Sequence, residues 1–280
     1  MRKRLLAFFL ILLIGVAGGC LGDSNSTTST TPPTESSSSS IPTPTKTTTT
    51  TSQNPIEVLK TSLEEIEEFT YLGRTSIHMN VTVLMGNLSQ NNTIALSMLE
   101  SGYIDFTSTE AVINTTTITE PDNTTLRTVR IIKDGKTYLK TTIGAGISSL
   151  NVTENTSPFI WNYNPASLAR KYITENPDEV IRNGETTELT YTLSWQDVKA
   201  LAILYLAVTE DTGIEIKGGR LTLTFEGGEL KGVELEYTVV TTSVVQDPIL
   251  GQMTIKISAK GLGSYEITSI NKKMNVETPT

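Results

Sequence analysis

The sequence predicts an α+β domain in which an antiparallel sheet packs against a few helices. Three observations lead to this prediction. Apolar residues recur at helical spacing just after residue 54, and they alternate with polar residues over much of the chain from residue 71 onward. An almost continuous apolar stretch near residue 200 also predicts a helix that the rest of the fold encloses.

The 280 residues divide into three segments of different composition. Residues 1–19 are basic and then apolar, residues 20–54 are almost all polar, and residues 55–280 have a globular composition. A segment of about 225 residues can bury a sizeable core and fits one domain as easily as two. The formal charge of −8 becomes more negative when residues 1–19 are removed, so we expect no nucleic acid partner.

The N-terminus has the order of an export signal. A basic start, Met1–Arg4, precedes the apolar run Leu5–Val16, and small residues lead to Cys20. The apolar run is shorter than the roughly 20 residues of a membrane-spanning helix. We therefore expect residues 1–19 to be a signal peptide.

The small residues before Cys20 resemble the lipobox of lipoprotein precursors, in which cleavage falls before the cysteine and its thiol takes a lipid. The resemblance implies a lipid anchor on Cys20 that holds the chain at the cell membrane, facing outside. Ala17 stands where the bacterial pattern usually has Leu, which suits an archaeal variant. The alternative is a plain signal anchor with Cys20 as a bystander.

Asp23–Gln53 is a Ser/Thr/Pro segment with almost no apolar residues, so it cannot offset its ordering entropy. We expect a disordered, extended spacer between the membrane and the domain. Asn-x-Ser/Thr sequons suggest a surface glycoprotein, and the alternative is Thr-rich strands that happen to contain Asn. The sequons begin at Asn25, Asn80, Asn87, Asn91, Asn114, Asn123, Asn151 and Asn155.

The domain opens with the features of a helix. Asn54 is a favoured N-cap, Pro55 suits the first turn, and Glu57 follows at the third position. Apolar residues then recur at helical spacing, which predicts an amphipathic helix of about four turns. These apolar residues are Ile56, Leu59, Leu63, Ile66 and Phe69.

A period of two predicts strands from Tyr71 onward. The first alternates through Ile77–Met85, with His78 and Asn80 on its polar face, and two more cover about 93–106 and 110–119. Asp134-Gly135 favours a two-residue turn, so residues 126–133 and 136–143 should form a hairpin.

Helices and strands are expected to mix in the middle of the chain. Residues 144–162 have the composition of a loop, and Asn164-Pro165 then starts a short helix that ends before Asn176. Thr186–Leu193 alternates as a strand, and Ser194 caps a further helix at 195–209.

The last part predicts an antiparallel meander with a turn at Glu226–Glu229. We interpret Gly218-Gly219 and Gly227-Gly228 as turns at strand ends, not as phosphate-binding loops. One polar and one apolar face is typical of a sheet that covers helices.

This order of elements behind a lipobox resembles the LolA/LppX-type lipoprotein fold over about residues 55–270. The resemblance implies a strongly curved antiparallel sheet, an incomplete barrel, with an N-terminal helix and inner helices on its concave side. It also implies a cavity between sheet and helices for a lipid or another hydrophobic ligand. No short motif is shared, so no functional residue is carried over.

Two groups of residues are candidates for lining such a cavity. Each aromatic candidate either lines a mouth for an apolar ligand or packs in the core and at its rim, and each aliphatic candidate is either ligand wall or core. The candidates are Trp161, Tyr163 and Trp195, which flank the inner helices, and Leu201, Leu204 and Val208 on the apolar helix.

The inventory of reactive residues argues against catalysis. His78 is the only histidine and Cys20 the only cysteine, which leaves no catalytic triad, zinc cluster or internal disulfide. We expect no catalytic residue, metal or cofactor. Carboxylate-pair hydrolysis stays open, because any two of the 30 acids could converge.

Two functions are the main hypotheses. The first is a membrane-anchored lipoprotein that binds a lipid or other hydrophobic ligand between sheet and helices. The second is a structural or interaction glycoprotein of the cell envelope with no small ligand, which the linker and the sequons favour. An enzyme is the third class.

Overall fold

The computed structural model describes residues 55–154, 158–206, 213–247 and 251–278. Within these ranges the chain forms one 11-stranded antiparallel sheet and four helices. The predicted signal peptide, Cys20 and the linker lie outside the described residues, and so do the sequons at Asn25 and Asn155.

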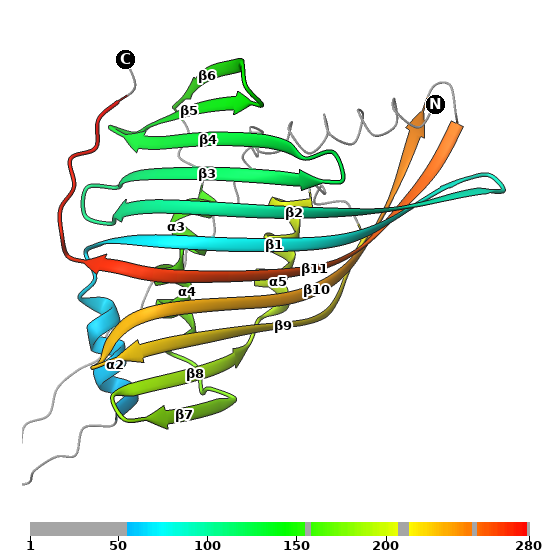
Figure 1. The fold of residues 1–280 in the computed structure, drawn as a ribbon. Coiled ribbons are helices and arrows are strands. Elements are labelled where there is room, and N and C mark those ends of the chain that lie inside the picture. The colour runs from blue at the N-terminus through cyan, green and yellow to red at the C-terminus, as the bar shows by residue number, and fades with distance from the viewer. Residues whose placement is uncertain (1–54, 155–157, 207–212, 248–250, 279–280) are drawn as a thin grey trace, which may run out of the picture.

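The first and last strands of the sequence pair with each other at the centre of the sheet. β1 (Glu68–Met85) lies between β2 (Leu88–Asp105) and β11 (Gly251–Ile270). From this centre the strand order runs outward to β6 on one side and to β7 on the other (Figure 1). The remaining strands are β3 (Glu110–Glu120), β4 (Thr124–Lys133), β5 (Lys136–Ile143), β6 (Ile147–Thr153), β7 (Glu179–Asn183), β8 (Thr186–Thr192), β9 (Gly213–Glu226) and β10 (Glu229–Asp247).

The sheet is antiparallel throughout and is not closed into a barrel, because β6 and β7 are its two edges and do not pair with each other. The predicted antiparallel sheet is therefore confirmed. Its hairpin turn at Asp134-Gly135 has positive φ angles of 51° and 71°, as a two-residue turn of this kind requires.

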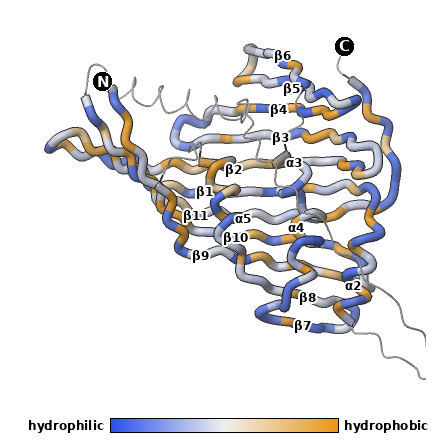
Figure 2. The backbone as a smooth tube through the Cα atoms, turned by 180° about the vertical axis from the view of Figure 1, so that it is seen from behind, coloured by the Kyte–Doolittle hydropathy of each residue, from blue (hydrophilic) through white to orange (hydrophobic). Residues whose placement is uncertain are grey.

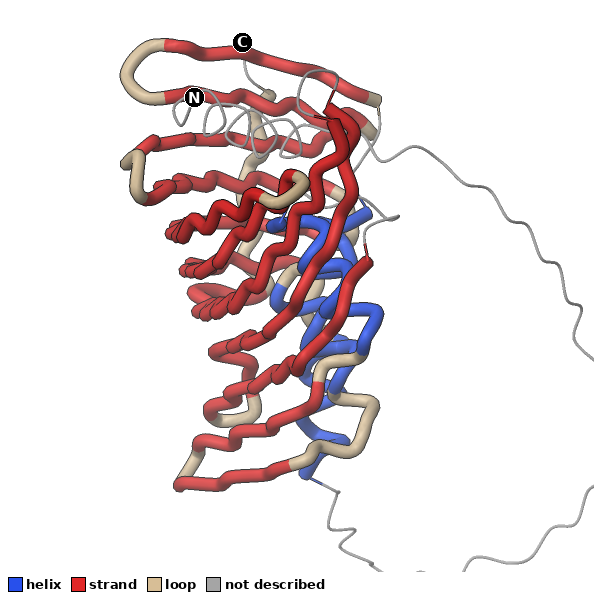
Figure 3. The backbone as a smooth tube through the Cα atoms, turned by 90° about the vertical axis from the view of Figure 1, so that its right-hand side faces the viewer, coloured by secondary structure: helices blue, strands red, loops and turns tan. Residues whose placement is uncertain are grey.

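The described helices gather on one face of the sheet, which Figure 3 shows from the side. They are α2 (Pro55–Glu64), α3 (Pro158–Tyr163), α4 (Pro165–Tyr172) and α5 (Trp195–Leu206). Their main contacts are with β9, with β10 and with one another. We call the face that carries these helices the inner face, and the opposite face the outer face.

Alternation along the strands separates the two faces. In β1 the odd positions from Phe69 to Val83 are buried towards the helices, and Leu72 and Arg74 are exposed on the outer face. Figure 2 shows the same alternation as changes of hydropathy along the central strands. Inner-face residues join residues such as Leu168 and Leu201 of the helices in one hydrophobic core. Each fully buried side chain of this kind contributes about 1.5–3 kcal/mol.

The predicted helix start at Asn164-Pro165 and the predicted cap at Ser194 are both present. The Asn164 side chain accepts a hydrogen bond from the Ser167 backbone N at 2.9 Å at the start of α4. The Ser194 Oγ accepts one from the Asp197 backbone N at 3.2 Å at the start of α5. These bonds satisfy donors that a helix N-terminus otherwise leaves free.

Several local predictions were wrong. The first helix ends at Glu64, and Phe69 lies in β1. The expected loop at 144–162 contains β6 and most of α3, and the strand β7 was not foreseen. Gly218-Gly219 lies within β9 and is not a turn, whereas Gly227-Gly228 does turn the chain, with positive φ at both residues.

Candidate functional site

Three tyrosine rings lie against glycines at the centre of the inner face. A Cβ on Gly102 would stand 2.1 Å from the Tyr71 ring, and one on Gly261 would stand 2.3 Å from the Tyr237 ring. Tyr265 covers Gly73 in the same way, at 2.8 Å. Because only glycine leaves this space, each ring can pack directly on the backbone of the neighbouring strand.

A carboxyl group, Glu100, joins this tyrosine cluster from β2. The Tyr71 hydroxyl donates a hydrogen bond to Glu100 Oε1 at 2.7 Å, and the Thr115 hydroxyl donates one to Oε2 at 3.2 Å. Burial raises the pKa of Glu100 above its ordinary value, although the two hydrogen bonds and the Arg130 guanidinium oppose the shift. Burial also lowers the pKa of Arg130.

The other phenols of the cluster approach one another from β10, β11 and α5. Tyr205 of α5 forms a hydrogen bond with Tyr265, whose hydroxyl lies 3.5 Å from Thr75 Oγ1. The Tyr237 hydroxyl is buried and has no hydrogen-bond partner among the described residues. Burial raises the pKa of Tyr237, and the nearby Tyr265 adds to this shift. An unpaired buried hydroxyl is costly, so a native structure that keeps one calls for an explanation.

The inner face is less completely buried on the β2–β5 side than on the β8–β11 side. Met98, Leu126, Leu139 and Ile143 all point to the inner face by register, and all keep part of their surface accessible. Leu126, Leu139 and Ile143 belong to neither of the two hydrophobic clusters that the described residues form. Apolar side chains therefore remain accessible on this side of the face.

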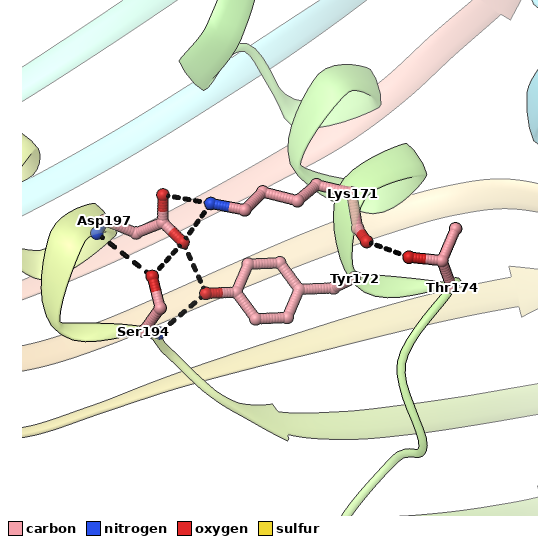
Figure 4. Close-up of polar contacts among 5 residues, drawn as sticks. All are labelled: Lys171, Tyr172, Thr174, Ser194 and Asp197. Carbon is pink, nitrogen blue, oxygen red and sulfur yellow. Dashed lines mark hydrogen bonds and ion pairs between the residues drawn. The ribbon is translucent and has the colours of Figure 1, made fainter. Parts of the chain in front are cut away.

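A second polar cluster joins the end of α4 to the start of α5 (Figure 4). Lys171 Nζ lies 2.6 and 2.7 Å from the two carboxylate oxygens of Asp197. Tyr172 and Ser194 also donate hydrogen bonds to Asp197 Oδ2, at 2.5 and 2.7 Å. The Asp197 side chain is only 2% exposed, whereas that of Lys171 is 46% exposed. Figure 4 shows all of these donors converging on one carboxylate.

The donors around Asp197 determine its charge state. Burial alone would raise the pKa of Asp197, but hydrogen bonds from Lys171, Tyr172 and Ser194 outweigh it and hold the pKa below its ordinary value. Burial and the bond to Asp197 raise the pKa of Tyr172 to about 12. Asp197 is therefore an anion that accepts hydrogen bonds from Lys171, Tyr172 and Ser194. This arrangement indicates a structural role, in which the cluster connects the end of α4 to the start of α5.

A pocket of about 380 Å³ opens beside the Asp197 cluster. Arg170 lies 4.3 Å from the centre of the Phe106 ring and donates a hydrogen bond to the Leu63 carbonyl at 2.9 Å, so it fastens α4 to the end of α2. The pocket is lined by Trp161, Asn162, Tyr163, Ser167, Arg170, Lys171 and Asp197.

The structure brings together two of the predicted cavity residues. Trp161 and Tyr163 line the pocket beside Asp197, whereas Trp195 is 53% exposed and is not among the lining residues. Leu201 is 2% exposed and belongs to the core. The side chain of Leu204 and the whole of Val208 lie outside the described residues.

Sequence reasoning missed the acids at both polar clusters. Glu100 lies on the same face of its strand as Leu96, Met98 and Ile104. A carboxyl group at an otherwise apolar position of a strand was the signal that could have identified it as a site residue. Asp197 stands three residues after the cap Ser194, the spacing of a capping box, which was a second signal.

A larger pocket, of about 490 Å³, lies on the outer face over β1, β2 and β9–β11. Its charged groups include Arg220 and Glu236, which lie 3.2 Å apart. Lys260 also approaches Glu236, at 2.5 Å. Exposed ion pairs of this kind contribute little to stability. Among the described residues, no three His, Cys, Asp or Glu side chains gather as a metal site would require.

The sequons within the described ranges are all exposed, at Asn80, Asn87, Asn91, Asn114, Asn123 and Asn151. Asn80 and Asn91 accept hydrogen bonds from Thr93 and Thr82, at 3.2 and 2.8 Å. Their positions are compatible with modification from solvent.

Comparison with known proteins identifies no family for this chain. No protein-family model matches it, and no curated protein matches it. Among solved structures it is similar to a beta-barrel-like protein of the domain of unknown function DUF1849 from Brucella abortus, with 6% identity over 73% of this chain and 100% of that chain and a TM-score of 0.24. The ywiB protein from Bacillus subtilis has 8% identity over 72% of this chain and 94% of its own, with a TM-score of 0.18. These TM-scores are too low to support a conclusion about this chain.

Proposed function

We propose that this chain is an extracytoplasmic lipoprotein, anchored through Cys20, whose domain binds a lipid or another hydrophobic ligand between the sheet and the helices. The observation that carries the proposal is the accessible apolar surface on the inner face of β2–β5. Leu126, Leu139 and Ile143 point to the same face as the helices, yet the main helix contacts are with β9 and β10. A bound alkyl chain would remove this surface from water, at about 25 cal/mol for each Å² covered.

The arrangement at the helix layer agrees with this proposal. Trp161 and Tyr163 combine an apolar body with a polar tip, and they line a pocket that opens to solvent beside two cationic side chains. The helices that the structure describes do not have the length and apolar character of a transmembrane span. In this proposal the lipid on Cys20 supplies the attachment, and the linker supplies the reach.

Ligand binding can be tested by native mass spectrometry of the mature chain after purification from its membrane. We expect an apolar molecule to remain bound to the wild-type chain and to be lost from a Leu139→Arg variant, because the new cation would lie on the inner face. Leu99→Arg is the matched control, since Leu99 is 55% exposed on the outer face. Retention of ligand by Leu139→Arg, or loss of ligand from both variants alike, would contradict the proposal that the ligand binds at the inner face.

The exposed sequons favour a second function, that of an envelope glycoprotein without a small ligand. All six sequons in the described ranges reach solvent. In this case the mature chain would carry glycans and would bring no ligand through purification. The same mass spectrum separates the two functions.

A further inference from the structure

One row of polar side chains crosses the inner face from its centre to its edge. Glu100 pairs with Thr115, Thr115 with Thr128, Thr128 with Thr141, and Thr141 with Ser149, each directly opposite the next across β2–β6. Glu100 is partly buried and Ser149 is exposed, so the row leads from the interior to the surface. We call these five residues the hydroxyl row.

The neighbours of the hydroxyl row are mainly apolar. Leu126 and Ile143 lie on one side of it, and on the other side Arg130 lies between Ile113 and Leu139. On the opposite half of the sheet, inner-face positions are instead occupied by buried apolar residues such as Leu223. Thr115, Thr128 and Thr141 are only partly buried and Ser149 is exposed, so their hydroxyls are accessible to a polar occupant that can form hydrogen bonds with them.

The inner end of the row offers both donors and acceptors. Glu100 and Tyr265 both lie against Gly73, at 3.4 and 2.8 Å from the position of its missing Cβ. Tyr265 is near Tyr237, whose buried hydroxyl has no partner among the described residues. A polar atom of a ligand could supply that missing partner.

The charges at the inner end select the kind of ligand. The register places Arg130 on the inner face two residues from Thr128, within electrostatic reach of Glu100. The inner end therefore carries groups of both signs, and an anionic head group would be repelled by the carboxylate and a cationic one by the guanidinium. A neutral group with several hydroxyls meets neither penalty. It can also donate to Glu100 and accept from the phenols and threonines.

From this arrangement we infer that the hydroxyl row binds the neutral, hydroxyl-bearing head group of an amphiphile, such as a sugar or glycerol head. The alkyl chain of the same molecule covers the apolar residues beside the row. This inference rests on the proposed function, because it names the chemical class of the ligand that the inner face takes.

The test compares three amphiphiles that share a dodecyl chain and differ in the head group. The protein is the full mature chain, residues 20–280, with Cys20→Ser so that its own anchor does not compete. Dodecyl maltoside, dodecyl sulfate and dodecyl trimethylammonium are titrated below their critical micelle concentrations, and binding is followed by calorimetry. We expect the maltoside to bind at least about tenfold more tightly than either charged amphiphile.

Two variants locate the head group. Tyr237→Phe and Thr115→Val keep the shape of the site and remove one hydroxyl each, and we expect each to weaken maltoside binding by about fivefold to tenfold while leaving the sulfate unchanged. Thr116→Val, on the outer face of the same strand, is the matched control and should bind like the unmodified chain. Circular dichroism confirms that each variant is folded.

The outcomes separate this inference from the proposed function. Equal binding of all three amphiphiles, with no effect of either variant, overturns the inference and leaves hydrophobic-ligand binding in place. Binding of none of them overturns both. Tighter binding of the sulfate or the ammonium compound overturns the inference that the head group is neutral and leaves hydrophobic-ligand binding in place.

Discussion

Replacing Cys20 with Ser should release the processed protein from the membrane fraction. Serine offers no thiol for a thioether, and each methylene of a membrane-buried lipid contributes about 0.8 kcal/mol to attachment. The apolar run Leu5–Val16 is too short to span a bilayer and is expected to be removed with the signal peptide. We therefore expect nearly all of the processed wild-type protein in the membrane pellet and nearly all of the processed variant in the soluble fraction.

Mass spectrometry of the N-terminal peptide completes this experiment. The wild-type peptide should begin at residue 20 and carry the mass of a diacyl or isoprenoid group. Ser24→Ala is the matched control in the linker and should fractionate like the wild type. A processed Cys20→Ser protein that still sediments with membranes, together with an unmodified wild-type peptide, would refute the anchor.

Replacing Asp197 with Ala should cost about 3 kcal/mol of folding free energy, because hydrogen bonds to a buried charged group contribute more than neutral ones. The change would remove the acceptor that Lys171, Tyr172 and Ser194 share, and the fully buried Tyr172 hydroxyl would lose the carboxylate to which it donates. Lys171 is half exposed and would regain water, which limits the loss. Urea denaturation of the variant and of the wild type measures the difference.

The pH dependence of this loss has a defined sign. The folded-state pKa of Asp197 is below its ordinary value, so its stabilisation is present above the ordinary pKa and disappears as the pH falls through the folded value. The gap between wild type and Asp197→Ala should therefore narrow below about pH 4. Glu229→Ala is the control, since its pair with Lys231 is exposed, and it should leave the denaturation midpoint unchanged. A gap that does not narrow in acid would contradict the role of the charge.

The fold was predictable where one local signal acted alone. The hairpin at Asp134-Gly135, the helix start at Asn164-Pro165 and the cap at Ser194 are each encoded by a few adjacent residues, and all three are present. Phe69 was misassigned because it fits both periods: it continues the helical spacing from Ile66 and also starts the alternation with Tyr71.

Other elements have too little sequence periodicity to be predicted. All five residues of β7 are exposed, so no alternation marks that strand. Helix α3 has six residues and is shorter than two turns, which is too short for a helical period. Gly219 breaks the pattern of β9 because α5 approaches it closely: a Cβ there would lie 2.6 Å from Val198.

The candidate site depended on contacts between distant parts of the sequence. Tyr71, Glu100 and Thr115 come from three strands, and Tyr205 joins them from α5. The apolar periodicity of each strand was visible in the sequence, but the register that aligns Glu100 with four hydroxyl residues was not. Only the pairing of whole strands creates the hydroxyl row.

Photoaffinity labelling tests the central claim most directly, namely that the inner face binds the apolar part of a ligand. The full mature chain is incubated with an amphiphile whose dodecyl chain carries a diazirine, irradiated, digested and mapped by mass spectrometry. Our account predicts labelling of peptides from β4 and β5, at or near Leu126, Leu139 and Ile143, and competition by unlabelled lipid. Labelling confined to the exposed outer-face residues Leu72, Leu99 and Leu262, or labelling that lipid does not compete away, would contradict it.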